Sequence, residues 1–278
     1  MSTGQDHGLF GPDSVTWRVH SSPVMLVGGM RALMIQTLHP LAMAGVVQHS
    51  DFRAKPLVRL RRTVEYVATV TFGDTAAAEA AGARVRNLHS RVRGTDRVTG
   101  REYSAEDPET LLWVHCVEVH SFLAAYRAFE GGLARADQDA YLAESARAAA
   151  QVGIPPETVP DSVEAMREYF AQMRPQLCAS LEAQEAVRFV LSPPLTRELL
   201  ALAVPLRVVS SAAASLLPDD LRRLAGIDRP RQVDQATGLA VSGAARAMAL
   251  GLRVPLVGRA GVGAIRRRVA AAPFAQAA

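Results

Sequence analysis

The stretch from Asp107 to Phe129, DPETLLWVHCVEVHSFLAAYRAF, decides the fold class of this chain. It opens with an N-cap aspartate, a proline at the first helical position and an acid in the first turn, which together are typical of a helix start. From Leu111 onward, apolar residues occur on nearly every face of the expected helix. Such a helix is stable only when other protein surrounds it. The sequence therefore predicts a buried central helix.

The helical pattern extends outward from this segment. Apolar residues recur at three- and four-residue spacing through most of the chain, and alternating β-type runs are few. Proline, glycine and capping residues set the expected ends. We expect further helices at about 23–38, 41–47, 56–73, 75–93, 137–151, 161–173, 196–216, 219–224 and 235–250, with a turn-rich loop at 94–107. The prediction is an all-α fold: a single-domain multi-helix bundle at 12–255, followed by a poorly ordered basic tail at 256–278.

Composition excludes several classes of protein. The chain has 278 residues, of which 49% are hydrophobic and 21% charged, as in globular proteins and unlike disordered or collagen-like chains. Two cysteines, Cys116 and Cys178, rule out a disulfide scaffold and a four-cysteine zinc site. Lys55 is the only lysine among 31 basic residues. Because these arginines form no long run and have no aromatic interleaving, we expect no nucleic-acid partner. A TetR-like regulator is disfavoured as well, since the first helix is too apolar to enter a groove.

The sequence also addresses membrane attachment. The apolar run from Val24 to Val47 carries Arg31, Gln36 and His39 near its middle, where hydrocarbon would penalise them. The first fourteen residues lack the basic and apolar regions of a signal peptide. We therefore expect no membrane span and a cytoplasmic location.

Histidines are the candidate chemical residues. All seven lie between positions 7 and 120, so histidine-dependent chemistry belongs to the N-terminal half. The usual hydrolase, nucleotide-binding and HExxH motifs do not occur. His115 and Glu118 lie three apart on one helical face, which is loosely similar to half of a carboxylate di-iron site. Such a site needs a second Glu-x-x-His pair and two more glutamates. A di-iron centre is therefore disfavoured.

An ordered series of short motifs resembles one oxygenase family, which includes the bacterial latex-clearing proteins that cleave rubber and the fungal mycophenolate-pathway oxygenase MpaB. The resemblance covers about Pro12 to Pro230. Its motifs are RALMIQTLHP at 31–40, HSDF at 49–52, RLRRT at 59–63 with FG at 72–73, HSRVRG at 89–94, Tyr103, DP at 107–108 and WVH at 113–115. The family implies an all-helical fold with a buried cofactor pocket. In the latex-clearing proteins the cofactor is a b-type haem, whose iron activates dioxygen to split carbon–carbon double bonds.

The resemblance also implies site residues. His89 matches the proximal haem ligand, and Arg93, four positions later, completes the H-x-x-x-R pattern. A neutral imidazole is a standard axial donor to haem iron. Without the resemblance, His89 would be interpreted as a helix-terminal histidine that contacts the last carbonyls. His115 follows Trp113 on the central helix and is either a second cofactor contact, an alternative ligand to His89, or a core residue.

Arg59 and Thr63 match the R-x-x-x-T element that faces the haem from the other side. Arg59 would pair with a propionate or stabilise negative charge on bound oxygen. The structural alternative is a solvated arginine and a threonine bonded back to its own helix. His39 would contact a propionate or the distal pocket, or would be a satisfied core histidine.

Two departures from the family bear on the reaction. The latex-clearing proteins carry a capping lysine where this chain has Arg62, and guanidinium does not readily ligate iron. They also use a glutamate upstream of R-x-x-x-T as a base, whereas no glutamate precedes Glu65 here. Rubber cleavage by that mechanism is therefore not supported.

The function predicted from the sequence is a haem-dependent oxygenase or peroxidase-like oxidoreductase. It would act on a small apolar substrate with dioxygen or peroxide, and aliphatic side chains would keep the chamber dry. The alternative is a helical carrier of an apolar ligand without redox chemistry. The sequence does not indicate an oligomeric state.

Overall fold

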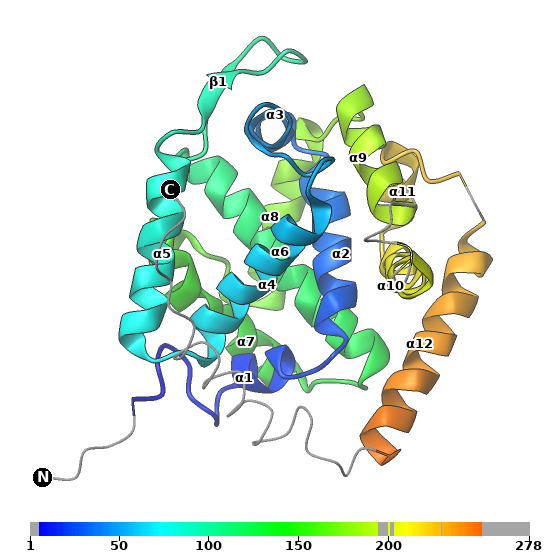
Figure 1. Cartoon of the computed structure of the whole chain (residues 1–278). Coiled ribbons are helices and arrows are strands. Elements are labelled where there is room, and N and C mark those ends of the chain that lie inside the picture. The colour runs from blue at the N-terminus through cyan, green and yellow to red at the C-terminus, as the bar shows by residue number, and fades with distance from the viewer. Residues whose placement is uncertain (1–5, 194–199, 201–202, 229, 252–278) are drawn as a thin grey trace, which may run out of the picture.

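The computed structural model describes residues 6–193, 200, 203–228 and 230–251, so the expected tail at 256–278 lies outside the described residues. Helices dominate the described part, and the predicted all-α class is confirmed (Figure 1). The α-helices are α1 (Val15–His20), α2 (Met25–Gln36), α3 (Pro40–His49), α4 (Pro56–Phe72), α5 (Thr75–His89), α6 (Pro108–Phe129), α7 (Arg135–Gln151), α8 (Val163–Met173), α9 (Leu181–Leu191), α10 (Ala203–Ser215), α11 (Asp219–Leu224) and α12 (Arg231–Gly251).

The predicted central helix is α6. The Asp107 side chain caps it by accepting hydrogen bonds from the Thr110 amide at 2.8 Å and the Thr110 hydroxyl at 2.7 Å. Trp113, Cys116 and Val117 are completely buried. The helix packs against α2 along one side and against α7 along another. Burial on several sides accounts for its nearly continuous apolar sequence.

Helix α2 approaches α6 closely because glycine stands at the crossing point. A Cβ added to Gly28 would lie 2.8 Å from Phe122 Cδ1 and 2.9 Å from Phe122 Cα. After α2, the chain breaks before Pro40, as the sequence predicts, and α3 begins there with Pro40 at its first position. Together, the close crossing of α2 and α6 and the chain break before Pro40 place His39 beside the first half of α6.

The expected loop at 94–107 is corrected by the structure, because it contains most of a β-hairpin. Strand β1 (Arg93–Thr95) pairs antiparallel with β2 (Glu102–Ser104), with Gly94 opposite Tyr103. Asp96 holds the turn by accepting hydrogen bonds from the amides of Val98 and Thr99. Strands of three residues are too short for an alternating pattern to be recognised. The hairpin also means that α5 ends at His89, earlier than the expected 93.

Two other differences concern helices. The sequence analysis did not predict α1 or α9. In the expected helix at 196–216, residues 196–199 and 201–202 lie outside the described residues, and the described helix starts at Ala203. Within the described chain, no helix combines the length and hydropathy needed to cross a membrane.

Helices α4 and α5 form a helical hairpin that carries three of the six predicted site residues, Arg59, Thr63 and His89. They join at Gly73, where Asp74 caps α5 by accepting a hydrogen bond from the Ala77 amide at 2.8 Å. Figure 1 shows the two helices diverging from this turn, with α6 running behind them. Arg59 near the start of α4 and His89 at the end of α5 are therefore both remote from the turn.

Candidate functional site

The side of α4 that faces the protein interior is incompletely covered by other residues. Leu60 and Val67 are partly buried against the two main core clusters, which places their side of the helix toward the interior. Val64 lies between them at helical spacing, yet it is 45% exposed. Thr63, its neighbour on this side, is exposed as well. The protein therefore leaves one turn of α4 open on its inward side.

Helix α5 also has one face that points toward the protein interior. Ala78 and Ala81 are buried, Val85 is half-buried, and His89 continues the same stripe at the end of the helix. The side chain of His89 thus points toward the interior of the protein and not into bulk solvent. Next to it Leu88 is 63% exposed, so the C-terminal end of α5 also carries an uncovered apolar side chain.

The third uncovered stripe belongs to α6. Leu111, Val114, His115 and Glu118 follow the i, i+3, i+4, i+7 spacing of one helix face, and all four are only half-buried. This is unexpected in the central helix, where Cys116 and Val117 beside them are fully buried. The face carries two titratable groups, a histidine and a carboxylate.

Tyr66 connects these three helices. It lies on α4, and its pKa is raised by burial and by the charge of Glu118 from α6, while Arg86 from α5 lowers it. The Tyr66 phenol is therefore sensitive to charges on both neighbouring helices. We refer to the exposed and half-buried side chains of these three helices described above, Thr63, Val64, Leu88, His89, His115 and Glu118, as the three-helix site.

His89 has an unsatisfied nitrogen. Among the described residues, its buried Nδ1 atom has no hydrogen-bond partner. Burial lowers the pKa of the imidazole, and the charge of Glu106 only partly opposes this effect. The ring is therefore neutral and keeps a lone pair available. A buried polar atom without a partner is rare and points to a missing ligand or to chemistry.

His115 has a partner, although the contact is long. Its Nε2 lies 3.4 Å from the Ser145 hydroxyl on α7, and burial lowers the pKa of the ring to about 4. His115 is thus a second neutral imidazole at the three-helix site. The alternatives that the sequence left for it, cofactor contact or core residue, both agree with this position.

Arg59 and Thr63 make local contacts. The Arg59 guanidinium donates to the Ser50 hydroxyl at the end of α3, and burial lowers its pKa. The Thr63 hydroxyl donates to the Arg59 carbonyl at 3.2 Å, as expected for a threonine bonded to its own helix. Ser50 is a neutral partner, so the positive charge of Arg59 is not neutralised by this contact.

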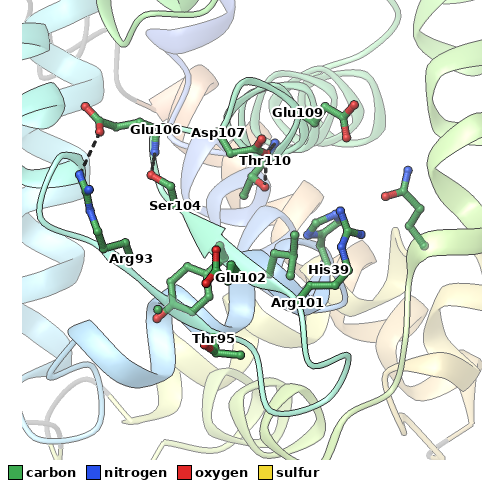
Figure 2. Close-up of a pocket in the computed structure, with 14 residues that line it drawn as sticks. His39, Arg93, Thr95, Arg101, Glu102, Ser104, Glu106, Asp107, Glu109 and Thr110 are labelled. Atoms are coloured by element: carbon green, nitrogen blue, oxygen red, sulfur yellow. Dashed lines mark hydrogen bonds and ion pairs between the residues drawn. The ribbon is translucent and has the colours of Figure 1, made fainter.

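A polar cleft of about 610 Å³ lies between the β-hairpin and the start of α6 (Figure 2). It brings together two predicted residues, His39 and Arg93, with Arg101, which the sequence analysis did not select. Arg93 donates to the Ser90 carbonyl at 2.7 Å and pairs with Glu106 at 3.6 Å. The charge of Glu106, which lines the cleft, also acts on the pKa of His89.

The tautomer of His39 follows from its position. Its Nδ1 accepts a hydrogen bond from the Ala42 amide at 3.4 Å, which makes it the N-cap of α3. Burial and the charge of Arg101 lower its pKa, so the ring is neutral. The proton is therefore on Nε2. Figure 2 shows the His39 ring beside the Arg101 side chain in the cleft. Together they offer an N–H donor and a cation.

The structure thus sorts these predicted residues into two groups. His89, Thr63 and His115 lie at the three-helix site, whereas His39 and Arg93 line the polar cleft. Arg101 had no sequence signal beyond its place in a turn-rich segment. In the described residues, no three histidine, cysteine, aspartate or glutamate side chains gather to hold a metal ion.

Comparison with known protein families identifies the class of this protein. A family model described as "ER-bound oxygenase mpaB/B′/Rubber oxygenase, catalytic domain" matches residues 17–253. The chain belongs to this family of oxygenase catalytic domains, as the sequence motifs predict. Comparisons with curated proteins and with solved structures find no match.

Proposed function

We propose that residues 12–255 form a single haem b-dependent oxygenase domain that acts on a small apolar substrate, with His89 as the axial ligand of the iron. One observation carries the proposal: the buried and unpartnered Nδ1 of His89, at the end of an inward-facing stripe. Membership in the oxygenase family supports the reaction class.

The donor set fits haem. A haem needs only one protein ligand, and His89 supplies a neutral imidazole. The porphyrin is flat and largely apolar, so it would cover the exposed side chains of Val64 and Leu88, which otherwise face water at an energetic cost. When bound, haem iron would supply the redox chemistry that activates dioxygen.

The polar cleft fits the other end of such a cofactor. Arg93, Arg101 and the Nε2–H of His39 would hold the propionate carboxylates through charge-assisted hydrogen bonds. Arg59 is half-buried and has a hydroxyl group as its partner, so its charge would remain available for a propionate or for negative charge that develops on oxygen. Thr63 would stand beside Arg59 on the same helix.

The proposed substrate class follows from aliphatic side chains on the half-buried face of α6 and on the open turn of α4. Leu111 and Val114 on α6, together with Val64 on α4, provide aliphatic surface without a hydrogen-bond pattern that would select a polar substrate. An apolar wall also excludes water, which quenches reactive oxygen species. We therefore propose a small apolar substrate, with dioxygen or peroxide as the co-substrate.

The test is an absorption spectrum of the purified protein after haem supplementation. We expect a Soret band at about one haem per chain, its loss in His89→Ala, and its retention in His115→Ala. His7→Ala is the matched control, because His7 is exposed and far along the chain from both groups. Absence of haem binding by the unmodified protein would overturn the proposal. Loss of the band only in His115→Ala would move the ligand to His115.

The carrier alternative rests on the same uncovered apolar side chains, because Val64 and Leu88 would equally pack against a lipid-like molecule. Native mass spectrometry of the purified protein separates the two functions. A bound mass that corresponds to haem supports the oxygenase, whereas an iron-free apolar molecule would favour the carrier.

A further inference from the structure

Glu118 is a carboxylate in the middle of the central helix. Its chain neighbours Val117 and Val119 are 0% and 6% exposed. Glu118 lies about midway along α6 and not at either end of the helix. Carboxylates are almost never found in such surroundings unless they are paired. Its presence there calls for a specific role.

The carboxylate has no partner. Within the described residues, Glu118 makes no hydrogen bond and no ion pair with another side chain or with the backbone. Its oxygen atoms are nevertheless not among the sealed polar atoms that lack a partner, which are His89 Nδ1 and the Tyr169 hydroxyl. The carboxylate therefore retains accessible surface, on the same half-buried stripe of α6 as His115.

The neighbours of Glu118 are neutral groups. The charge of Glu118 raises the pKa of two phenols, Tyr66 on α4 and Tyr141 on α7. His115 shares its helix face, and Arg86 of α5 acts on Tyr66 while donating to the Gln151 carbonyl. Tyr141 is in turn bonded to the neutral His20 of α1 at 2.9 Å. Burial without a compensating cation raises the pKa of Glu118 to about 7.

We propose that Glu118 is the acid–base residue of the three-helix site, an inference that rests on the proposed function. Its carboxylate takes a proton from an acid bound beside it, leaving the conjugate base at the site, and later returns that proton to a product. Such a group is most effective when it exchanges a proton near the working pH. The Glu118 carboxyl group is accessible, and it has no hydrogen bond or ion pair that must break before the proton transfer.

The first experiment needs no cofactor. Carbon-13 NMR of protein labelled at its glutamate carboxyl groups, recorded across pH 4 to 9, should show one resonance that titrates near pH 7. That resonance should be lost in Glu118→Gln and kept in Glu79→Gln, which removes an exposed glutamate of α5. Titration of every glutamate near pH 4 to 5 would overturn the inference, whether or not haem binds.

The second experiment uses haem-loaded protein and hydrogen cyanide, an acid that must lose its proton before cyanide binds ferric iron. With a base at the site, the association rate should rise with a midpoint near pH 7. We expect Glu118→Gln to slow association at pH 8 by about 10- to 100-fold at unchanged haem content, and to remove the step from the pH profile. Glu118→Asp should restore the step, since it keeps the carboxylate.

Unchanged cyanide kinetics in Glu118→Gln, at full haem content, would overturn the role of Glu118 and leave the proposed function intact. Failure of the unmodified protein to take up haem would instead reject the proposed function, and the NMR titration would still decide whether Glu118 holds a proton at neutral pH. Because glutamine has the shape of glutamate, circular dichroism should show unchanged helix content in the variant.

Discussion

At the scale of single residues, Arg222 and Asp234 form a buried ion pair between α11 and α12. Their side chains are 5% and 0% exposed, and the Nη1–Oδ2 distance is 2.7 Å. The Ser211 hydroxyl donates to the other oxygen of Asp234 at 2.7 Å, and Arg222 also donates to the Ala214 carbonyl at 2.8 Å. The pair therefore ties α10, α11 and α12 together.

We expect Asp234→Ala to destabilise the protein by about 3 to 5 kcal/mol, because the mutation leaves a buried guanidinium without its anion. Urea denaturation followed by circular dichroism measures the loss. The matched control is Asp137→Ala, which removes the anion of the Arg18–Asp137 pair, where both side chains are more than a third exposed. That change should cost less than about 1 kcal/mol. Equal losses in both variants would contradict the role of burial.

At the scale of elements, the crossing of α2 and α6 depends on one glycine of an adjacent pair. Gly28 has no room for a Cβ, since Phe122 Cα would lie at 2.9 Å and the Ser121 carbonyl oxygen at 3.0 Å. Gly29 is different, because the nearest atom to an added Cβ is Phe122 Cε1 at 4.0 Å. The two glycines are thus adjacent in α2, but only Gly29 has room for a Cβ atom.

We expect Gly28→Ala to lower the midpoint of thermal unfolding, with a loss of about 1 to 3 kcal/mol from overpacking. Gly29→Ala should be neutral or stabilising by up to about 1 kcal/mol, because alanine favours the helix more than glycine does. Differential scanning calorimetry of both variants compares them. The assigned packing would be refuted by a Gly28→Ala variant as stable as Gly29→Ala.

At the scale of the whole molecule, burial lowers the pKa values of several histidines among the described residues, and it does so furthest for His20, to about 3, His115, to about 4, and His120, to about 3. An unfolded chain protonates histidine near pH 6.5. Below that pH the unfolded state binds protons that the folded state does not, so the stability present above pH 6.5 is lost as the pH falls. Each histidine contributes a loss of more than about 1 kcal/mol per pH unit.

Glu118 acts in the opposite direction. Its pKa in the folded protein, about 7, lies above the ordinary value of 4.5. The folded state therefore binds this proton more readily than the unfolded state, and it gains stability as the pH falls through this range. Three histidines outweigh one carboxyl group. We therefore expect the urea midpoint to fall between pH 6.5 and pH 5, and to fall more steeply in Glu118→Gln. A constant or rising midpoint in the unmodified protein would be inconsistent with neutral buried histidines.

The sequence by itself determined the elements whose ends carry a local chemical signal. Asp107 with Pro108 starts α6, Pro40 starts α3, and Pro56 starts α4, because a capping side chain or a fixed φ acts within a few residues. The motifs around His89 and Arg59 likewise indicated the oxygenase family. The short hairpin escaped prediction, since strands of three residues carry a weak signal. Helix α9 was missed although Ser180 caps its start.

Only the tertiary structure decided what surrounds each side chain. Thr63 and Val64 look like ordinary helix residues in the sequence, and Glu118 differs from other glutamates only in its apolar neighbours. Their open surface arises where α4, α5 and α6 diverge, and the meeting of His39, Arg93 and Arg101 arises where the hairpin packs against α3 near the start of α6. Burial and unsatisfied hydrogen bonding depend on segments distant in the chain, so no local pattern records them.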